Sequence, residues 1–154
     1  MPNDAASLPA IELTRVIDAP AASIYRAWTD PLLIRHWLAE PPYKVERVLT
    51  EAHTGGIYRI QVRGTEGREY AIGGEYLDLV PGRRIVMSWD YRSPGAPPST
   101  TAQCVTVRLT ELGARRSQLD LLHEGIGDLA ARERMIRAWT VLLEKLDQIY
   151  VKTD

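Results

Sequence analysis

Residues 128–150 constrain the fold more than any other part of this 154-residue chain. Their apolar side chains recur mostly at steps of three and four, which is the spacing of one face of an α-helix. At about 1.5 Å per residue such a helix would be about 35 Å long and would span a whole small domain. Because an amphipathic helix must bury its apolar face, the rest of the chain has to supply a surface that covers it.

The rest of the chain predicts short helices and strands. Pro20 and Pro31 suit the first turns of two short helices, Asp30 can cap the second of them, and Asp128 can cap the long helix. The second short helix is expected to end near Trp37. Alternating and β-branched runs predict strands at residues 11–17, 44–52, 57–63, 68–80, 84–91, 102–112 and 117–123.

This order of elements predicts an α+β fold. Six consecutive strands form an antiparallel meander, and a curved sheet of about seven strands packs on the C-terminal helix with a cavity between them. The length is sufficient for one domain with its own core. We expect that domain over residues 11–154, preceded by a disordered tail at 1–10.

Composition excludes several classes of function. The 19 basic and 20 acidic residues are interleaved, which argues against a nucleic-acid partner. No apolar run approaches the length of about 18 residues that membrane insertion needs. Cys104 is the single cysteine, so an internal disulfide is excluded, and a cytoplasmic location is expected.

The sequence also lacks the common signatures of cofactor and metal sites. His36, His53 and His123 fall on different predicted elements without ligand spacing, so no metal site is expected. The glycine pairs do not form a phosphate-binding loop between a strand and a helix, and no cofactor is predicted. Cys104 and Ser88 lack the surroundings of a nucleophile.

Strand alternation and helical periodicity direct one group of side chains toward the space between sheet and helix. If the apolar face of residues 57–63 is buried, Arg59 and Gln61 lie outside. Plain core packing is the alternative for Met87, Trp89 and Trp139. The predicted ligand-binding residues are Trp37, Tyr58, Ile60, Tyr76, Met87, Trp89, Leu121, His123, Met135 and Trp139.

His123 is the candidate for acid or base catalysis. It shares a strand face with Leu121, and its ordinary pKa near 6.5 suits proton transfer at neutral pH. Glu75 and Tyr76 are its candidate partners. Two other roles stay open for His123: orienting a polar end of a ligand, or forming a structural hydrogen bond at the end of its strand.

A set of short motifs is distributed over the chain from about residue 13 to residue 149. The motifs are Arg15-Val16-Ile17-Asp18-Ala19-Pro20, Ala27-Trp28-Thr29-Asp30-Pro31, Trp37, Gly55-Gly56-Ile57-Tyr58-Arg59, Gly74-Glu75-Tyr76, Trp89, residues 119–125, Trp139 and Leu142. Together they resemble the helix-grip fold of the START-like (SRPBCC) superfamily, and within it the family of small bacterial proteins similar to the activator of Hsp90 ATPase.

The resemblance implies three classes of function. A carrier or sensor would bind a small hydrophobic or aromatic molecule in the cavity without catalysis, and this class is favoured. An enzyme similar to polyketide cyclases and dehydratases would act on a bound ligand with a cavity acid or base. A protein-partner module would use an exposed face for a chaperone or homodimer contact. Fold alone does not decide between them.

Overall fold

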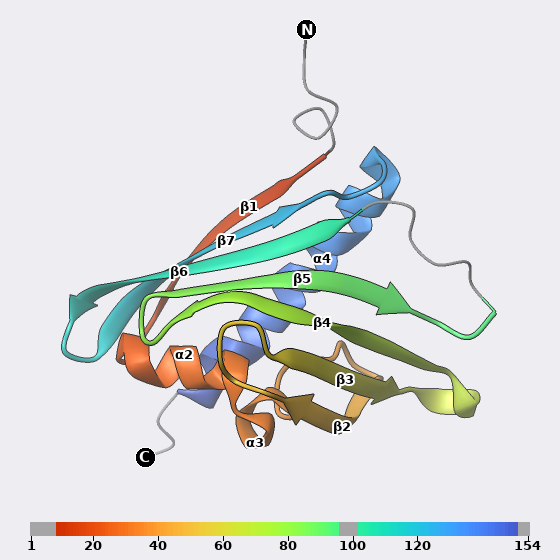
Figure 1. The fold of residues 1–154 in the computed structure, drawn as a ribbon, viewed down its shortest axis with the longest axis horizontal. Coiled ribbons are helices and arrows are strands. Elements are labelled where there is room, and N and C mark those ends of the chain that lie inside the picture. Colours follow the sequence, from red (N-terminus) through yellow and green to blue (C-terminus); the bar gives the residue numbers. More distant parts are fainter. Residues whose placement is uncertain (1–8, 96–101, 151–154) are drawn as a thin grey trace, which may run out of the picture.

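A seven-stranded antiparallel sheet organises the structure, a computed structural model that describes residues 9–95 and 102–150 (Figure 1). Eight residues of the predicted tail, 1–8, lie outside the described residues. The strands are β1 (Ile11–Ile17), β2 (Lys44–Thr50), β3 (Ile57–Arg63), β4 (Glu69–Val80), β5 (Arg84–Arg92), β6 (Gln103–Gly113) and β7 (Arg116–Glu124). The helices are α2 (Ala21–Thr29), α3 (Pro31–Ile34), the 3-10 helix η1 (Thr65–Gly67) and α4 (Leu129–Ile149).

The strand order confirms the predicted meander. The sheet runs β1-β7-β6-β5-β4-β3-β2, so each strand from β2 to β6 pairs with the next one along the chain. β1 completes the sheet by pairing antiparallel with β7, with Ile11 opposite His123. The chain therefore has the α+β architecture of a helix-grip fold, with α4 lying across one face of the sheet (Figure 1).

The caps that start α3 and α4 are the predicted ones. The Asp128 carboxylate accepts a hydrogen bond from the backbone N–H of Ala131 at 2.7 Å, and Asp30 accepts one from Leu32 at 2.9 Å. α3 is shorter than predicted. After Ile34 the backbone N–H groups of His36 and Trp37 bond carbonyls only three residues back, which tightens the chain into turns.

Side-chain hydrogen bonds fix α4 to the segments around its C-terminal half. The ammonium of Lys145 donates to the backbone carbonyl of Ala39 at 2.7 Å. The hydroxyl of Tyr150 donates to the carbonyl of Ser23 in α2 at 2.9 Å. Together these contacts tie the C-terminal half of α4 to α2 and to the segment after α3. None of the helices within the described residues is long and apolar enough to cross a membrane.

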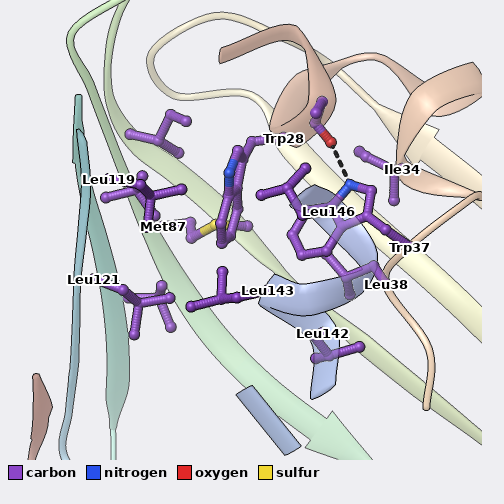
Figure 2. Packing of buried hydrophobic residues seen from close by; sticks show 14 of the residues in the cluster. Trp28, Ile34, Trp37, Leu38, Met87, Leu119, Leu121, Leu142, Leu143 and Leu146 are labelled. Atoms are coloured by element: carbon purple, nitrogen blue, oxygen red, sulfur yellow. Dashed lines mark hydrogen bonds between the residues drawn. The ribbon is translucent and has the colours of Figure 1, made fainter. Parts of the chain in front are cut away.

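All four tryptophans belong to one continuous cluster in the core. The ring centroids of Trp28 lie 4.7 Å from Trp37 and 5.9 Å from Trp139, and Trp139 lies 5.3 Å from Trp89. The Trp37 indole N–H donates to the carbonyl of Ala27 at 2.8 Å, and Figure 2 shows this bond beside the leucines of α4. The cluster joins α2, the segment after α3, β5 and α4.

The sheet turns its apolar face toward α4. Tyr58, Ile60 and Val62 of β3 are buried, whereas Arg59 is exposed on the opposite face and Gln61 is half-buried. The buried tyrosine hydroxyl of Tyr58 still has a partner, since it donates to the carbonyl of Ser88 at 2.6 Å. Phenolic groups can therefore fill this core because their polar ends bond to the backbone.

We predict that truncating Trp139 to alanine lowers the free energy of unfolding by about 3 to 5 kcal/mol, because the side chain is fully buried and its removal leaves a large void. Urea denaturation measures this value. Leu129→Ala on the same helix is the control and should change stability by less than about 0.5 kcal/mol, since Leu129 is 71% exposed. Near-native stability of the Trp139 variant would contradict the packing described above.

Candidate functional site

A cavity of about 480 Å³ lies between the N-terminal half of α4 and the sheet. This volume is within the range of about 300 to 1,000 Å³ that is typical of small-molecule sites. Its wall on the helix side comes mainly from the turns of α4 that precede Trp139, with Leu142 beyond it. The described residues that line it are Leu38, Glu40, Pro41, Tyr43, Tyr70, Ile72, Trp89, Tyr91, Gln103, Ile126, Gly127, Ala131, Arg134, Met135, Ala138 and Leu142.

Three tyrosines form an aromatic wall of the cavity. The ring of Tyr70 lies 5.3 Å from Tyr43 in an edge-on arrangement and 5.0 Å from Tyr91 in a stacked one. Burial raises the pKa of the Tyr70 hydroxyl, and the neighbouring Tyr91 adds to the shift. Burial also raises the pKa of Tyr91. These hydroxyls therefore stay protonated at neutral pH and can donate or accept hydrogen bonds.

The turn between β7 and α4 forms a further part of the cavity wall. Gly125 has a positive φ of 82°, and a Cβ at this position would collide with the carbonyl oxygen of Ala102. Only glycine combines this backbone conformation with such a close approach. The turn delivers Ile126 and Gly127 to the cavity just before the helix begins.

A directed chain of hydrogen bonds leads from the core to the cavity wall. The indole N–H of Trp139 donates to Nδ1 of His123 at 2.9 Å, and Nε2 of His123 lies 2.7 Å from Oε1 of Gln103. An indole nitrogen can only donate, so Nδ1 of His123 must accept and its proton must be on Nε2. The bond to Gln103 is therefore donated by the histidine.

His123 is held as a neutral ring. It is fully buried, and burial lowers its pKa from 6.5 to about 4. Its imidazole also packs edge-on against Trp89 at a centroid distance of 5.7 Å. The ring is not among the residues that line the cavity, whereas its two neighbours Gln103 and Trp89 are. At neutral pH His123 thus serves to position its neighbours.

The structure places the predicted site residues in two groups. Trp89 and Met135 line the cavity. His123 and Trp139 stand one contact behind it, in the hydrogen-bonded chain to Gln103. The others pack in the core rather than on the cavity wall, and these are Trp37, Tyr58, Ile60, Tyr76, Met87 and Leu121.

The three residues predicted to act together in catalysis, His123, Glu75 and Tyr76, do not form one hydrogen-bonded group among the described residues. Glu75 is exposed on the outer face of the sheet, where its backbone N–H donates to the hydroxyl of Ser88 at 2.8 Å. Tyr76 is buried, and its hydroxyl donates to the carbonyl of Trp28 at 3.1 Å. Neither side chain has a hydrogen bond to His123 among the described residues.

Several residues that line the cavity were not predicted from the sequence. Gln103 shares a face of β6 with the buried Val105 and Val107, so alternation alone would have found it. Tyr43 lies in the segment after two prolines, where no periodicity applies. Arg134 is exposed on α4. Its charge predicts a position on the solvated face of the helix and not on a cavity wall.

The described residues contain no group of three or more His, Cys, Asp or Glu side chains that could hold a metal ion. The cavity is instead lined by aromatic and aliphatic side chains with a few polar groups: the amide of Gln103, the carboxylate of Glu40 and the guanidinium of Arg134. Such a wall favours an uncharged or weakly polar organic molecule over a bare ion.

Comparison with known proteins places this architecture in a family. Activator of Hsp90 ATPase homolog 1-like proteins match the chain over residues 18–150. The chain belongs to this family. Among curated proteins, no sequence matches it. Membership indicates a ligand-binding or chaperone-related module at the level of the family.

Solved structures of bacterial family members and neighbours share the fold. Protein CV1439 from Chromobacterium violaceum is 33% identical, with a TM-score of 0.79 over 94% of this chain and 99% of that one. The AHSA1 protein from Silicibacter pomeroyi is 18% identical, with a TM-score of 0.79 over 91% and 96%. Protein Ms6760 from Mycobacterium smegmatis is 16% identical, with a TM-score of 0.78 over 98% and 95%. The last two similarities concern the fold alone.

The lowered pKa of His123 predicts how stability depends on pH. The His123 side chain takes up a proton near pH 6.5 in the unfolded chain but only near pH 4 in the folded one. The contribution of the neutral ring to the free energy of unfolding is therefore fully present above pH 6.5 and is lost as the pH falls toward 4. The expected loss attributable to His123 is about 3 kcal/mol. Urea denaturation at several pH values measures it.

Two variants isolate this contribution. His123→Gln should be less stable at neutral pH but should lack this part of the pH dependence. His53→Gln should keep the dependence of the wild type, since His53 is exposed. If wild type and His123→Gln lose stability in parallel between pH 7 and pH 4, His123 does not stay neutral in the fold.

Proposed function

We propose that this protein is a carrier or sensor that binds a small hydrophobic or aromatic molecule in the cavity between α4 and the sheet. One observation carries the proposal: the tryptophan cluster fills the core under the C-terminal half of α4, while about 480 Å³ remains beside its N-terminal half. The wall of that space is mainly aromatic and aliphatic. Its tyrosines and Trp89 offer ring faces and edges against which a planar ligand can pack.

The tyrosines of the cavity and the histidine behind it support binding rather than catalysis. Among the described lining residues, the tyrosine hydroxyls of Tyr70 and Tyr91 have raised pKa values and would be poor bases at neutral pH. His123 is neutral, and both of its ring nitrogens already have partners. Catalysis by His123 would require it to leave Trp139 or Gln103.

The two alternatives differ from this proposal in what they require. A cyclase-like enzyme would convert its bound ligand, so that a product would accumulate during incubation. A module for a chaperone or homodimer contact would act through an exposed face, and filling the cavity would not affect it. Ligand binding, with or without conversion of the ligand, therefore requires an empty cavity, and a protein-partner module does not.

Filling the cavity should abolish binding. We expect naphthalene derivatives, aromatic acids, flavonoids or fatty acids to quench tryptophan fluorescence and to raise the melting temperature, because a ligand that binds only the folded state stabilises it. Ala138→Trp places a large side chain in the cavity wall and should weaken binding at least about tenfold, which is about 1.4 kcal/mol. Thermal shift and equilibrium dialysis measure both effects.

Val141→Trp is the matched control. It adds the same side chain to the same helix at a residue that is 37% exposed and does not line the cavity. This variant should bind as the wild type does. The proposal fails if no compound of the panel binds the wild type, or if Ala138→Trp folds and binds as tightly as Val141→Trp does.

A further inference from the structure

The hydrogen-bonded chain that ends at Gln103 gives the cavity wall a defined polarity. Because Trp139 can only donate and Nδ1 of His123 must accept, the histidine presents its N–H to Gln103. The oxygen of the Gln103 amide is therefore the atom that faces His123. The NH₂ at the other end of the same planar amide can only donate, and Gln103 lines the cavity.

We propose that Gln103 determines specificity by selecting ligands that carry an acceptor oxygen, as a ketone or carboxylate group on an aromatic or otherwise apolar body. This inference rests on the proposed ligand-binding function. In an ordinary glutamine either end of the amide can turn toward a ligand. Here a turned amide would set its NH₂ against the N–H of His123 and leave two donors facing each other.

The neighbours of Gln103 fit such a ligand. Trp89 pairs with Gln103 across β5 and β6 and lines the same cavity, so an aromatic body can pack beside the amide. Arg134 contributes a positive charge from α4, which favours a carboxylate over an ammonium group. Glu40 also lines the cavity, and its negative charge works against a carboxylate on the ligand but not against a ketone.

A pair of probes of the same shape tests the proposal on the wild type. 2-Acetylnaphthalene carries a carbonyl oxygen where 2-isopropenylnaphthalene carries a methylene group. We expect the ketone to bind about five- to tenfold more tightly in equilibrium dialysis, which corresponds to one net hydrogen bond. Equal affinities of the two probes would overturn the inference while leaving ligand binding intact. If neither probe nor any compound of the wider panel binds, the proposed function itself fails.

Gln103→Glu tests whether the amide is responsible. One carboxylate oxygen can still accept from His123, but the other would present an acceptor to the cavity, so the preference for the ketone should disappear. Gln148→Glu makes the same change at an exposed residue of α4 and should keep the preference. A folded Gln103→Glu protein that still prefers the ketone fivefold would contradict the assignment. The wild-type comparison decides the inference if this variant does not fold.

The tautomer of His123 provides a readout that packing alone would not produce. Nitrogen-15 spectra of the wild type should show a neutral ring with its proton on Nε2 and a bare Nδ1. Addition of 2-acetylnaphthalene should leave that tautomer unchanged. A proton on Nδ1 in the wild type would set two donors, Trp139 and His123, against each other and would leave Nε2 to accept from the NH₂ of Gln103. That result would overturn the proposed donor role of Gln103.

Discussion

The hydrogen bond from the Trp139 indole to Nδ1 of His123 is the contact on which the rest of the structure depends. Both residues are fully buried, and the bond joins α4 to β7 across the interior. Leaving either polar group unpaired there would cost about 1 to 3 kcal/mol. The same bond selects the tautomer of His123 and so determines which end of Gln103 can face the cavity. The bond that ties α4 to β7 therefore also sets the polarity of this part of the cavity wall.

The two halves of α4 contact different parts of the structure. Its buried residues, Trp139, Leu142, Leu143 and Leu146, lie from the middle of the helix onward and pack with the tryptophan cluster. The turns before Trp139 contribute most of the helix side of the cavity instead. The fold thereby combines a well-packed core at one end of α4 with a cavity at the other, so that filling the cavity need not disturb the core.

Most of the fold could be predicted because its determinants are local. Periodicity of 3.6 and 2 residues identified the long helix and the strands, and Asp30 and Asp128 marked helix starts as capping residues do. The residues that line the cavity were harder to predict from the sequence. Alternation shows that Met87 and Leu121 face inward but does not show that neighbouring side chains fill the space around them. Tyr43 and Arg134 reach the cavity through the tertiary arrangement, and the lowered pKa of His123 follows from burial that no local pattern encodes.

The central claim is that ligands enter the cavity beside the N-terminal half of α4 and not the interior under the middle of the sheet. Two methionines report on these two places, since Met135 lines the cavity and Met87 is buried in the core. Carbon-13 methyl spectra of the methionine-labelled protein, titrated with 2-acetylnaphthalene, compare them directly. The account predicts a large shift of the Met135 signal and little change at Met87. A shift at Met87 with an unchanged Met135 signal would contradict it.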